Sequence, residues 1–215
     1  LQSAFDELQA ELQTEVDWLY ETRCDRCDGQ ATTAYTVYSY TFECTRCLNR
    51  VPLFDCVKAA GQTAKGKPKT IRACPHCFAS GLVEEINTRR NRRYRSIPVM
   101  IGYDCNEGCS PTRAERRHND PDPKKRTFFE EYDLAKLREI EEREIPHWHP
   151  PHRMMNVESD TAPWGDKWRA GTSNFRTVAD LFTKRNLWAL AALYHEAKIS
   201  KRNFEADPFL FALNA

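Results

Sequence analysis

The segment "CDRCDGQATTAYTVYSYTFECTRC" at positions 24–47 contains two Cys-x-x-Cys pairs with sixteen residues between them. This spacing falls in the range typical of four-cysteine zinc sites. Each Cys-x-x-Cys turn presents two sulfur ligands to one ion, and an intervening strand can bring the second pair into place to complete a tetrahedron. We therefore predict a first metal site, formed by Cys24, Cys27, Cys44 and Cys47.

A redox pair and a disulfide frame are the alternatives to a metal site. A thioredoxin-like redox motif would require one Cys-x-x-Cys pair at a strand–helix junction, whereas this segment has two facing pairs. The first twenty residues contain five acidic side chains and lack the apolar region of a secretion signal, and no apolar run is long enough for a membrane span. We expect a cytoplasmic chain without a membrane partner, in which cysteines stay reduced and bind metal.

A second cysteine group has looser spacing. Cys74-Pro-His-Cys77 is separated by twenty-seven residues from Cys105-x-x-x-Cys109. These four cysteines predict a second site, in which His76 is an alternative ligand that we expect to be exposed instead. Four thiolates leave no open coordination position, so both zinc ions are expected to be structural. The ninth cysteine, Cys56, lies in an apolar strand pattern and is expected to be a buried core thiol.

Basic residues are concentrated in one segment, although the whole chain has a net charge of only +1. Residues 61–100 carry nine basic side chains against Glu84 and Glu85, and "RRNRRYR" at 89–95 is placed at the tip of a predicted hairpin. A bare charge run is usually a solvated loop, but on a zinc ribbon these side chains favour contact with phosphates and bases. The predicted nucleic-acid-binding residues are Lys65, Lys67, Lys69, Arg89, Arg90, Arg92, Arg93, Tyr94 and Arg95.

The pattern along the chain predicts an α+β fold in four parts. An N-terminal helix (1–21) precedes a tandem zinc-ribbon region of short antiparallel strands (22–110), a proline-broken linker (111–126) and a mainly helical region (127–215). Strands are expected at 31–43 and 51–57, a polar loop at 58–70, and helices at 127–144 and 176–199.

The C-terminal region also contains aromatic and imidazole side chains within loops. His147, His149 and His152 lie in a proline-rich loop, which favours a packed loop over a metal site. Trp148, Trp164 and Trp168 are expected to be core or interface anchors, and 162–174 is expected to be a loop. Asp207 and Pro208 have the pattern of a helix start close to the end of the sequence, from which we expect a fragment of a longer protein.

Several catalytic patterns are absent from the sequence. It contains no Gly-x-Gly cofactor loop, no Walker loop and no Gly-x-Ser-x-Gly motif. No general acid–base pair can be assembled from its motifs. We therefore assign no catalytic residue to this chain.

Taken in order, several segments resemble the adenine-specific DNA methyltransferases that contain a zinc ribbon. These segments are "EVDWLYETRCDRC", "FECTRCLNRVPLFDC", "CPHC", "IPHWHPPHRMM", "WGDKWRAG" and "VADLFTKRNLWALAAL", of which "DLFTKRNLWAL" (180–190) is the most specific. The resemblance implies that the chain is an insert within a Rossmann-like catalytic domain that uses S-adenosylmethionine. The family's cofactor loop and its Pro-Pro-Tyr catalytic motif have no counterpart here, and "HPPH" at 149–152 shares only the two prolines.

The resemblance implies a module that helps the parent enzyme to hold or select DNA without catalysing a reaction or binding S-adenosylmethionine itself. Its partners would be DNA and the rest of the methyltransferase catalytic domain, within a restriction–modification or defence system. The alternative is a structural or protein-interaction zinc module, in which the arginines contact an acidic protein.

Overall fold

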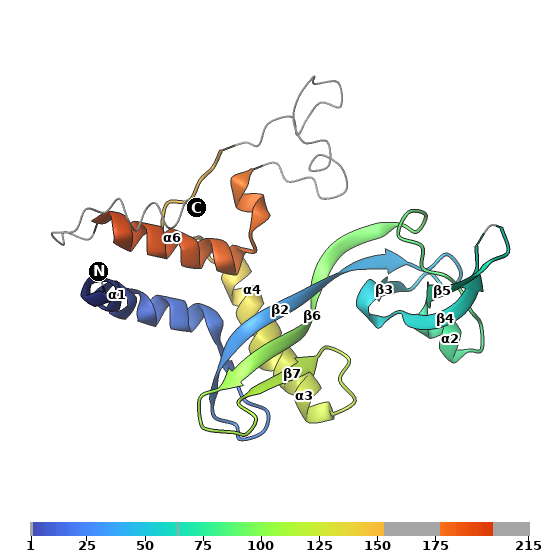
Figure 1. The fold of residues 1–215 in the computed structure, drawn as a ribbon, viewed down its shortest axis with the longest axis horizontal. Coiled ribbons are helices and arrows are strands. Elements are labelled where there is room, and N and C mark those ends of the chain that lie inside the picture. Colours follow the sequence, from blue (N-terminus) through green and yellow to red (C-terminus); the bar gives the residue numbers. More distant parts are fainter. Residues whose placement is uncertain (1, 64, 153–176, 200–215) are drawn as a thin grey trace. The chain divides into compact units, whose positions relative to one another are not determined.

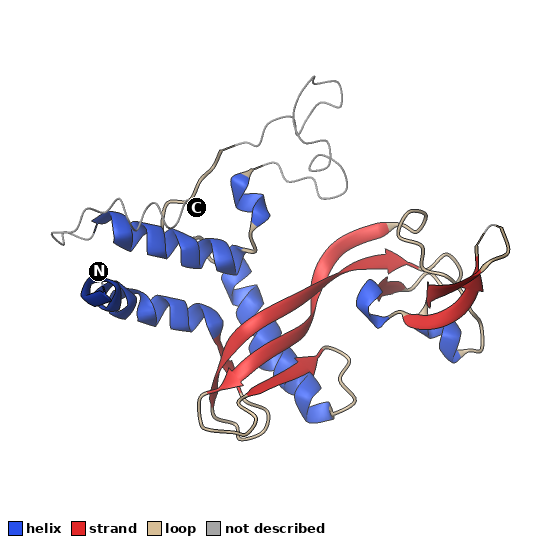
Figure 2. Cartoon of the chain, in the orientation of Figure 1, coloured by secondary structure: helices blue, strands red, loops and turns tan. Residues whose placement is uncertain are grey.

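The computed structural model describes residues 2–63, 65–152 and 177–199, and it has the predicted α+β architecture. The chain forms two compact units. Thr22–Leu134 is called the ribbon unit below, and Leu1–Glu21 together with Ala135–Ala215 is called the helical unit. Figure 2 shows that the long strands belong to the first unit and that the second is built from helices.

The ribbon unit is built around two long antiparallel strands, β2 (Gln30–Glu43) and β6 (Arg93–Cys105). The Thr, Tyr and Val residues of β2 favour an extended backbone, and the absence of glycine, proline, asparagine and aspartate from 31–43 allows one uninterrupted strand. Shorter strands extend this sheet, namely β1 (Glu21–Arg23), β3 (Arg50–Pro52) and β7 (Arg113–Arg117). The strand predicted at 31–43 is thus confirmed.

A separate hairpin replaces the loop predicted at 58–70. Strand β4 (Val57–Gln62) pairs with β5 (Pro68–Ala73). A Cβ atom on Gly61 would lie 2.6 Å from Ile71 Cγ2, so this glycine permits close packing within the hairpin. The strand predicted at 51–57 is also wrong, since β3 ends at Pro52 and a 3₁₀ turn, η1 (Leu53–Asp55), follows.

The segment predicted as a linker, residues 111–126, contains a strand and the start of a helix. Strand β7 pairs with β6, and helix α3 (Pro123–Phe128) continues into the π-helical turn η2 (Phe129–Leu134). Asp122 caps α3 by accepting a hydrogen bond from the Lys124 amide at 2.9 Å. The prolines of this segment therefore lie at a helix start and in turns of the ribbon unit. The segment is not a linker, because β7 belongs to the sheet.

The helical unit contains α1 (Gln2–Tyr20), α4 (Ala135–Glu142), η3 (Val178–Leu181) and α6 (Lys184–Ile199). Its core includes Leu19, Ile140 and Trp188, and the Trp188 ring lies 5.4 Å from the Trp18 ring. These two tryptophans are the anchors that the sequence analysis did not select. Trp148 is 54% exposed, so it is not a core residue and only the interface alternative of its prediction stays open, while Trp164 and Trp168 lie outside the described residues.

The C-terminal helix begins later than predicted. The sequence pattern indicated a helix over 176–199, whereas η3 precedes an extended Phe182 and α6 starts at Lys184. Asp180 accepts a hydrogen bond from the Thr177 amide at 2.9 Å, which closes the short η3 turn on itself. The loop predicted at 162–174 and the helix start at Asp207 and Pro208 lie outside the described residues.

Candidate metal centres

Two Cys-x-Arg-Cys turns of the ribbon unit have the same backbone geometry. In the first, the Asp28 amide donates to the Cys24 carbonyl at 2.9 Å, and in the second the Leu48 amide donates to the Cys44 carbonyl at 2.9 Å. The residue after each second cysteine has a positive φ, 60° at Asp28 and 59° at Leu48. This left-handed residue lets the chain turn back so that both sulfurs of a pair point to the same side.

The structure groups all eight predicted ligands into two four-cysteine clusters, but it pairs them differently from the prediction. Centre A consists of Cys24, Cys27, Cys105 and Cys109, and centre B consists of Cys44, Cys47, Cys74 and Cys77. The prediction that Cys24 and Cys27 share a site with Cys44 and Cys47 is therefore wrong, as is the pairing of Cys74 and Cys77 with Cys105 and Cys109. Centre B is nested between the two halves of centre A in the sequence.

The length of β2 explains this pairing. Its fourteen residues form one strand, and at about 3.3 Å per residue they separate the first Cys-x-x-Cys turn from the second by roughly 45 Å of chain. Ala31 near the start of β2 lies opposite Cys105, and Phe42 near its end lies opposite Arg93. The antiparallel ribbon thus brings the end of β6 to the first turn, and centre B forms at the other end (Figure 1).

The sulfur positions fit tetrahedral coordination of zinc. Sulfur atoms about 2.3 Å from a tetrahedral zinc ion lie about 3.8 Å from one another. In centre A the Cys27–Cys105 and Cys24–Cys109 distances are 3.6 and 4.0 Å. In centre B the Cys44–Cys77 and Cys47–Cys74 distances are both 3.7 Å. Each centre could hold one zinc ion, and its four thiolates would leave no position for a substrate.

Hydrogen bonds favour a thiolate at one cysteine of each turn. The Asn49 amide is the main cause that lowers the pKa of Cys47 to about 6. Burial opposes ionisation of Cys24, but the amides of Arg26 and Cys27 outweigh it and lower the pKa of Cys24 to about 6. Burial raises the pKa of Cys77 to about 12, and its hydrogen bonds to neighbouring cysteines add to this effect. Four thiolates at one centre therefore require a cation.

A buried arginine beside centre A was missed by the sequence analysis. All five N–H groups of Arg116 donate hydrogen bonds, and its side chain is 0% exposed. The acceptors are both carboxylate oxygens of Asp133, the Thr22 hydroxyl, the Arg23 carbonyl and, at 3.3 Å, the Asp25 carboxylate.

Asp25 connects this network to the metal-binding turn. It lies between the two cysteines of the first turn and accepts a hydrogen bond from the Tyr103 hydroxyl at 2.5 Å. That hydroxyl is 3.9 Å from the Cys24 sulfur, and burial together with the bond to Asp25 raises the pKa of Tyr103. The network therefore fixes the turn that presents Cys24, while η2 supplies Asp133 from the other side.

The predicted basic side chains lie toward the centre B end of the ribbon unit. Lys65 and Lys67 are exposed at the β4–β5 turn, whereas Lys69 pairs with Glu85 at 2.8 Å. The arginines of the turn that links centre B to β6 are exposed, and so is Arg95 in β6. The Tyr94 ring lies 4.0 Å from the Arg50 guanidinium, and its hydroxyl donates to Glu43 at 2.5 Å. Tyr94 therefore already has partners within the ribbon unit.

Cys56 is partly rather than fully buried. It packs against the apolar cluster around centre B, and its thiol lies 3.8 Å from the Pro52 carbonyl oxygen. Burial is the main cause that raises the pKa of Cys56 to about 11. His76, the alternative ligand of the second predicted site, is absent from both sulfur clusters.

The histidine loop of the helical unit is packed only in part, because His147 and His149 are half-buried whereas Trp148 and His152 are exposed. The Glu15 carboxylate lies 3.0 Å from His147 Nε2 and accepts a hydrogen bond from Trp188 Nε1 at 2.6 Å. His149 and His152 line a cavity of about 400 Å³ next to α6. Within 2–63, 65–152 and 177–199, the groups of three or more metal-ligating side chains are the two cysteine clusters alone.

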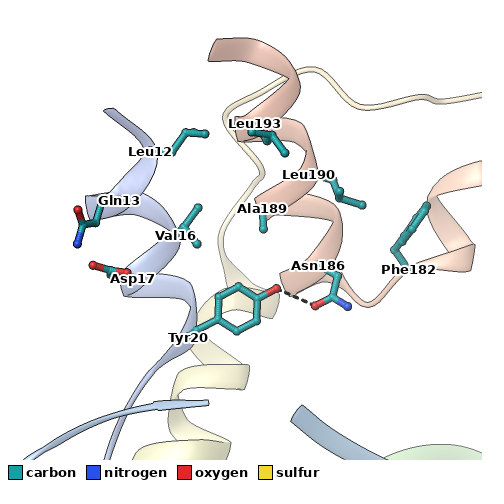
Figure 3. Close-up of a pocket in the computed structure, with 10 residues that line it drawn as sticks. All are labelled: Leu12, Gln13, Val16, Asp17, Tyr20, Phe182, Asn186, Ala189, Leu190 and Leu193. Atoms are coloured by element: carbon teal, nitrogen blue, oxygen red, sulfur yellow. Dashed lines mark hydrogen bonds between the residues drawn. The ribbon is translucent and has the colours of Figure 1, made fainter. Parts of the chain in front are cut away.

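A second depression in the helical unit lies between α1 and α6. Figure 3 shows Leu12 and Val16 of α1 facing Ala189 and Leu193 of α6 across a groove of about 630 Å³. Its polar groups include the Tyr20 hydroxyl, which donates to the Asn186 side chain at 2.9 Å. An apolar groove of this kind has packing surface but no arrangement of acid, base and nucleophile.

Comparison of this chain with protein-family models, with curated proteins and with solved structures finds no match. Among the described helices, none combines the length and the apolar character that crossing a membrane would require.

Proposed function

We propose that the ribbon unit is a DNA-contacting module stabilised by two structural zinc ions. The sulfur–sulfur distances of 3.6–4.0 Å support zinc at both centres. Neither four-cysteine cluster offers the open coordination position of a catalytic zinc, so the metal contributes folding free energy and no reaction step. The contact surface then has to come from side chains around the centres.

The observation that carries DNA contact is the rigid arginine turn at 88–92. The Asn91 side chain is buried, where its amide donates to the Glu43 carbonyl and accepts from the Asn87 amide, both at 2.8 Å. The Asn87 side chain in turn accepts from the Arg89 amide at 3.0 Å. With the turn held in this way, Arg89 and Arg90 expose their side chains from a fixed backbone, and Arg92 is exposed with its guanidinium 5.1 Å from the centre of the Tyr94 ring. Preorganised guanidinium groups suit contact with phosphates.

The resemblance to adenine-specific DNA methyltransferases supports a specific context for this module. In such an enzyme the module would grip the DNA next to the target adenine while a separate catalytic domain, with S-adenosylmethionine, modifies the flipped base. We assign no catalytic residue to this chain and propose that the remaining catalytic domain is its protein partner.

A protein-docking role is the second candidate, because apolar side chains are exposed close to centre B. Leu48 in the second Cys-x-Arg-Cys turn is 69% exposed, and Phe78, Leu82 and Val83, which follow Cys77 in the sequence, are 43%, 40% and 54% exposed. The Thr45 hydroxyl of that turn donates a 2.8 Å hydrogen bond to the Glu84 side chain, which follows Val83, so the two segments meet at the surface. Exposed apolar side chains close together favour a protein partner over DNA.

Salt-dependent binding to a DNA duplex tests the first role. The triple variant Arg89→Ala, Arg90→Ala, Arg92→Ala should bind duplex more weakly, and the slope of log K against log salt should fall by about 2.7 if each arginine contacts one phosphate. A matched control removes three exposed charges near the other end of the ribbon, with Arg113→Ala, Lys124→Ala and Arg126→Ala. Equal slopes for the two triple variants would contradict the arginine turn as the contact site.

A further inference from the structure

The hairpin of β4 and β5 forms a two-stranded sheet of its own (Figure 1). The outer edge of β5 is occupied at its C-terminal end. There the Ile86 amide donates to the Arg72 carbonyl at 2.7 Å, and the Cys74 amide accordingly donates to the next segment, at the Glu84 carbonyl, at 2.8 Å. The outer edge of β4 differs, because no strand among the described residues pairs with it.

The register of the hairpin shows which backbone groups of β4 point to this open edge. In an antiparallel pair, residues whose N–H and C=O bind the partner strand alternate with residues whose groups point away from it. Arg72 belongs to the second set, and it lies opposite Lys58. The amides and carbonyls of Lys58, Ala60 and Gln62 therefore point outward, and no hydrogen bond from another described residue reaches them.

The open edge is regular over its whole length. β4 pairs with β5 in one continuous register from Val57 to Gln62, whereas the register of β2 with β6 shifts along the pair. Edge strands are usually protected by bulges, prolines or several charged side chains. β4 has no proline, and Lys58 is its single charged residue. A regular edge of this kind is the surface to which an extended peptide adds as a further strand.

The charge of the hairpin indicates the kind of peptide that fits. Between Asp55 and Glu84 the chain contains five basic side chains and no acidic one. Lys58 and Arg72 lie directly opposite each other, both are exposed, and neither forms a salt bridge with a described residue. Like charges at directly opposite positions of a sheet repel each other. A carboxylate on a third strand, next to Lys58, would reduce this repulsion.

We propose that the outer edge of β4 binds an extended acidic segment of a partner protein by strand addition. The outward amides and carbonyls of Lys58, Ala60 and Gln62 bond to the added strand, and one of its acidic side chains lies beside Lys58. Phosphate groups match this edge less well, since they accept hydrogen bonds but cannot donate to the outward carbonyls. The site goes beyond the proposed DNA contact and does not depend on it.

The test measures binding of a fluorescent peptide of about nine residues, in which glutamate alternates with threonine, to the full zinc-loaded chain. Ala60→Pro removes an outward amide and is tolerated at a strand edge, so affinity for the peptide should fall at least about tenfold. Ala60→Thr is the matched control, because it keeps the amide and favours a strand, and it should retain affinity. Zinc content and circular dichroism establish that each variant is folded.

A second variant tests the charge without changing the backbone. Lys58→Glu places a carboxylate opposite Arg72, where it forms a cross-strand ion pair and keeps the hairpin folded. Affinity for the glutamate peptide should fall about tenfold, while a peptide with lysine in place of glutamate should bind this variant better than the unaltered chain. Unchanged affinity for the glutamate peptide would overturn the proposal, whether or not Ala60→Pro folds.

Three further outcomes would also contradict strand addition by an acidic segment. One is equal peptide affinity of folded Ala60→Pro and Ala60→Thr. Another is a dimer of the unaltered chain, in sedimentation, that Ala60→Pro dissociates, because a second copy would then occupy the edge. The third is competition by duplex DNA that Lys58→Glu abolishes and Ala60→Pro leaves unchanged, which would assign the hairpin to the DNA contact instead.

Discussion

The guanidinium of Arg116 donates two hydrogen bonds to the carboxylate of Asp133, at 2.6 and 2.7 Å. Both side chains are fully buried. This two-point contact joins β7 to the π-helical turn η2, and through Asp25 it reaches the turn that carries Cys24. If β7, η2 or the turn that carries Cys24 moved out of this arrangement, a buried charge would lose its partner, which is energetically costly. The fully hydrogen-bonded ion pair therefore favours this one arrangement of the three elements.

Replacement of Arg116 should therefore destabilise the ribbon unit strongly. Arg116→Met keeps much of the side-chain volume but leaves Asp133 and Asp25 without their cation, and we expect a loss of about 3 kcal/mol or more in the free energy of unfolding. Urea denaturation of the zinc-loaded protein, followed by circular dichroism, measures this loss.

Arg113 on the same strand supplies the control. It pairs with Asp104 at 2.7 Å, but its side chain is 61% exposed. Arg113→Met should cost less than about 1 kcal/mol, as is usual for surface ion pairs. Equal costs for the two substitutions would contradict the role assigned to the buried network.

The eight cysteine ligands and the long strand could be identified from the sequence, but the grouping of the cysteine pairs into two metal centres could not. Cysteine spacing identifies ligand pairs locally, whereas the choice of partner pair depends on whether the chain turns back between them. Residues 31–43 contain none of the glycine, proline, asparagine or aspartate that a tight turn favours, and this signal could have excluded a shared site for Cys24 and Cys44.

The role of Arg116 had no comparable local signal. The stretch around it is polar and contains three prolines, the pattern of a linker, and its partners Thr22, Arg23 and Asp25 lie more than ninety positions earlier in the sequence. A lone arginine becomes a core residue only when tertiary packing supplies its acceptors.

Paired cysteine substitutions test the nested arrangement directly. Cys24→Ser with Cys105→Ser removes two ligands from centre A, and the protein should retain one zinc ion against a competing chelator. Cys24→Ser with Cys44→Ser removes one ligand from each centre, and both ions should be lost more readily. The two sites predicted from sequence spacing would give the reverse pattern, so metal content after gel filtration distinguishes the two arrangements.

Zinc removal should act on the ribbon unit and leave the helical unit folded. All nine cysteines lie between positions 24 and 109, whereas all five tryptophans lie in Leu1–Glu21 or Ala135–Ala215. On addition of a strong chelator we expect the β-sheet signal in circular dichroism to fall, because structural zinc supplies much of the folding free energy of small ribbons. The tryptophan emission maximum should stay constant. A red shift of that emission in step with zinc loss would contradict independent folding.

The two Cys-x-Arg-Cys turns provide a matched pair for a test of backbone strain. Position 48 holds leucine at φ 59°, and the equivalent position 28 holds aspartate at φ 60°. A left-handed conformation costs an ordinary residue roughly 1–2 kcal/mol, while asparagine and aspartate tolerate it better. Since the Leu48 side chain is 69% exposed, Leu48→Asn loses little burial and should raise the free energy of unfolding by about 0.5–1 kcal/mol.

The reciprocal change, Asp28→Leu, should lower the free energy of unfolding by a similar amount, because it places a leucine in the left-handed conformation of the equivalent turn of centre A. Both values come from urea denaturation with zinc present. Destabilisation by Leu48→Asn would show that Leu48 is retained for packing rather than tolerated under strain. Stabilisation by Leu48→Asn would show that the protein tolerates backbone strain at position 48 while the leucine side chain stays exposed. That result is expected if centre B has a protein-docking role.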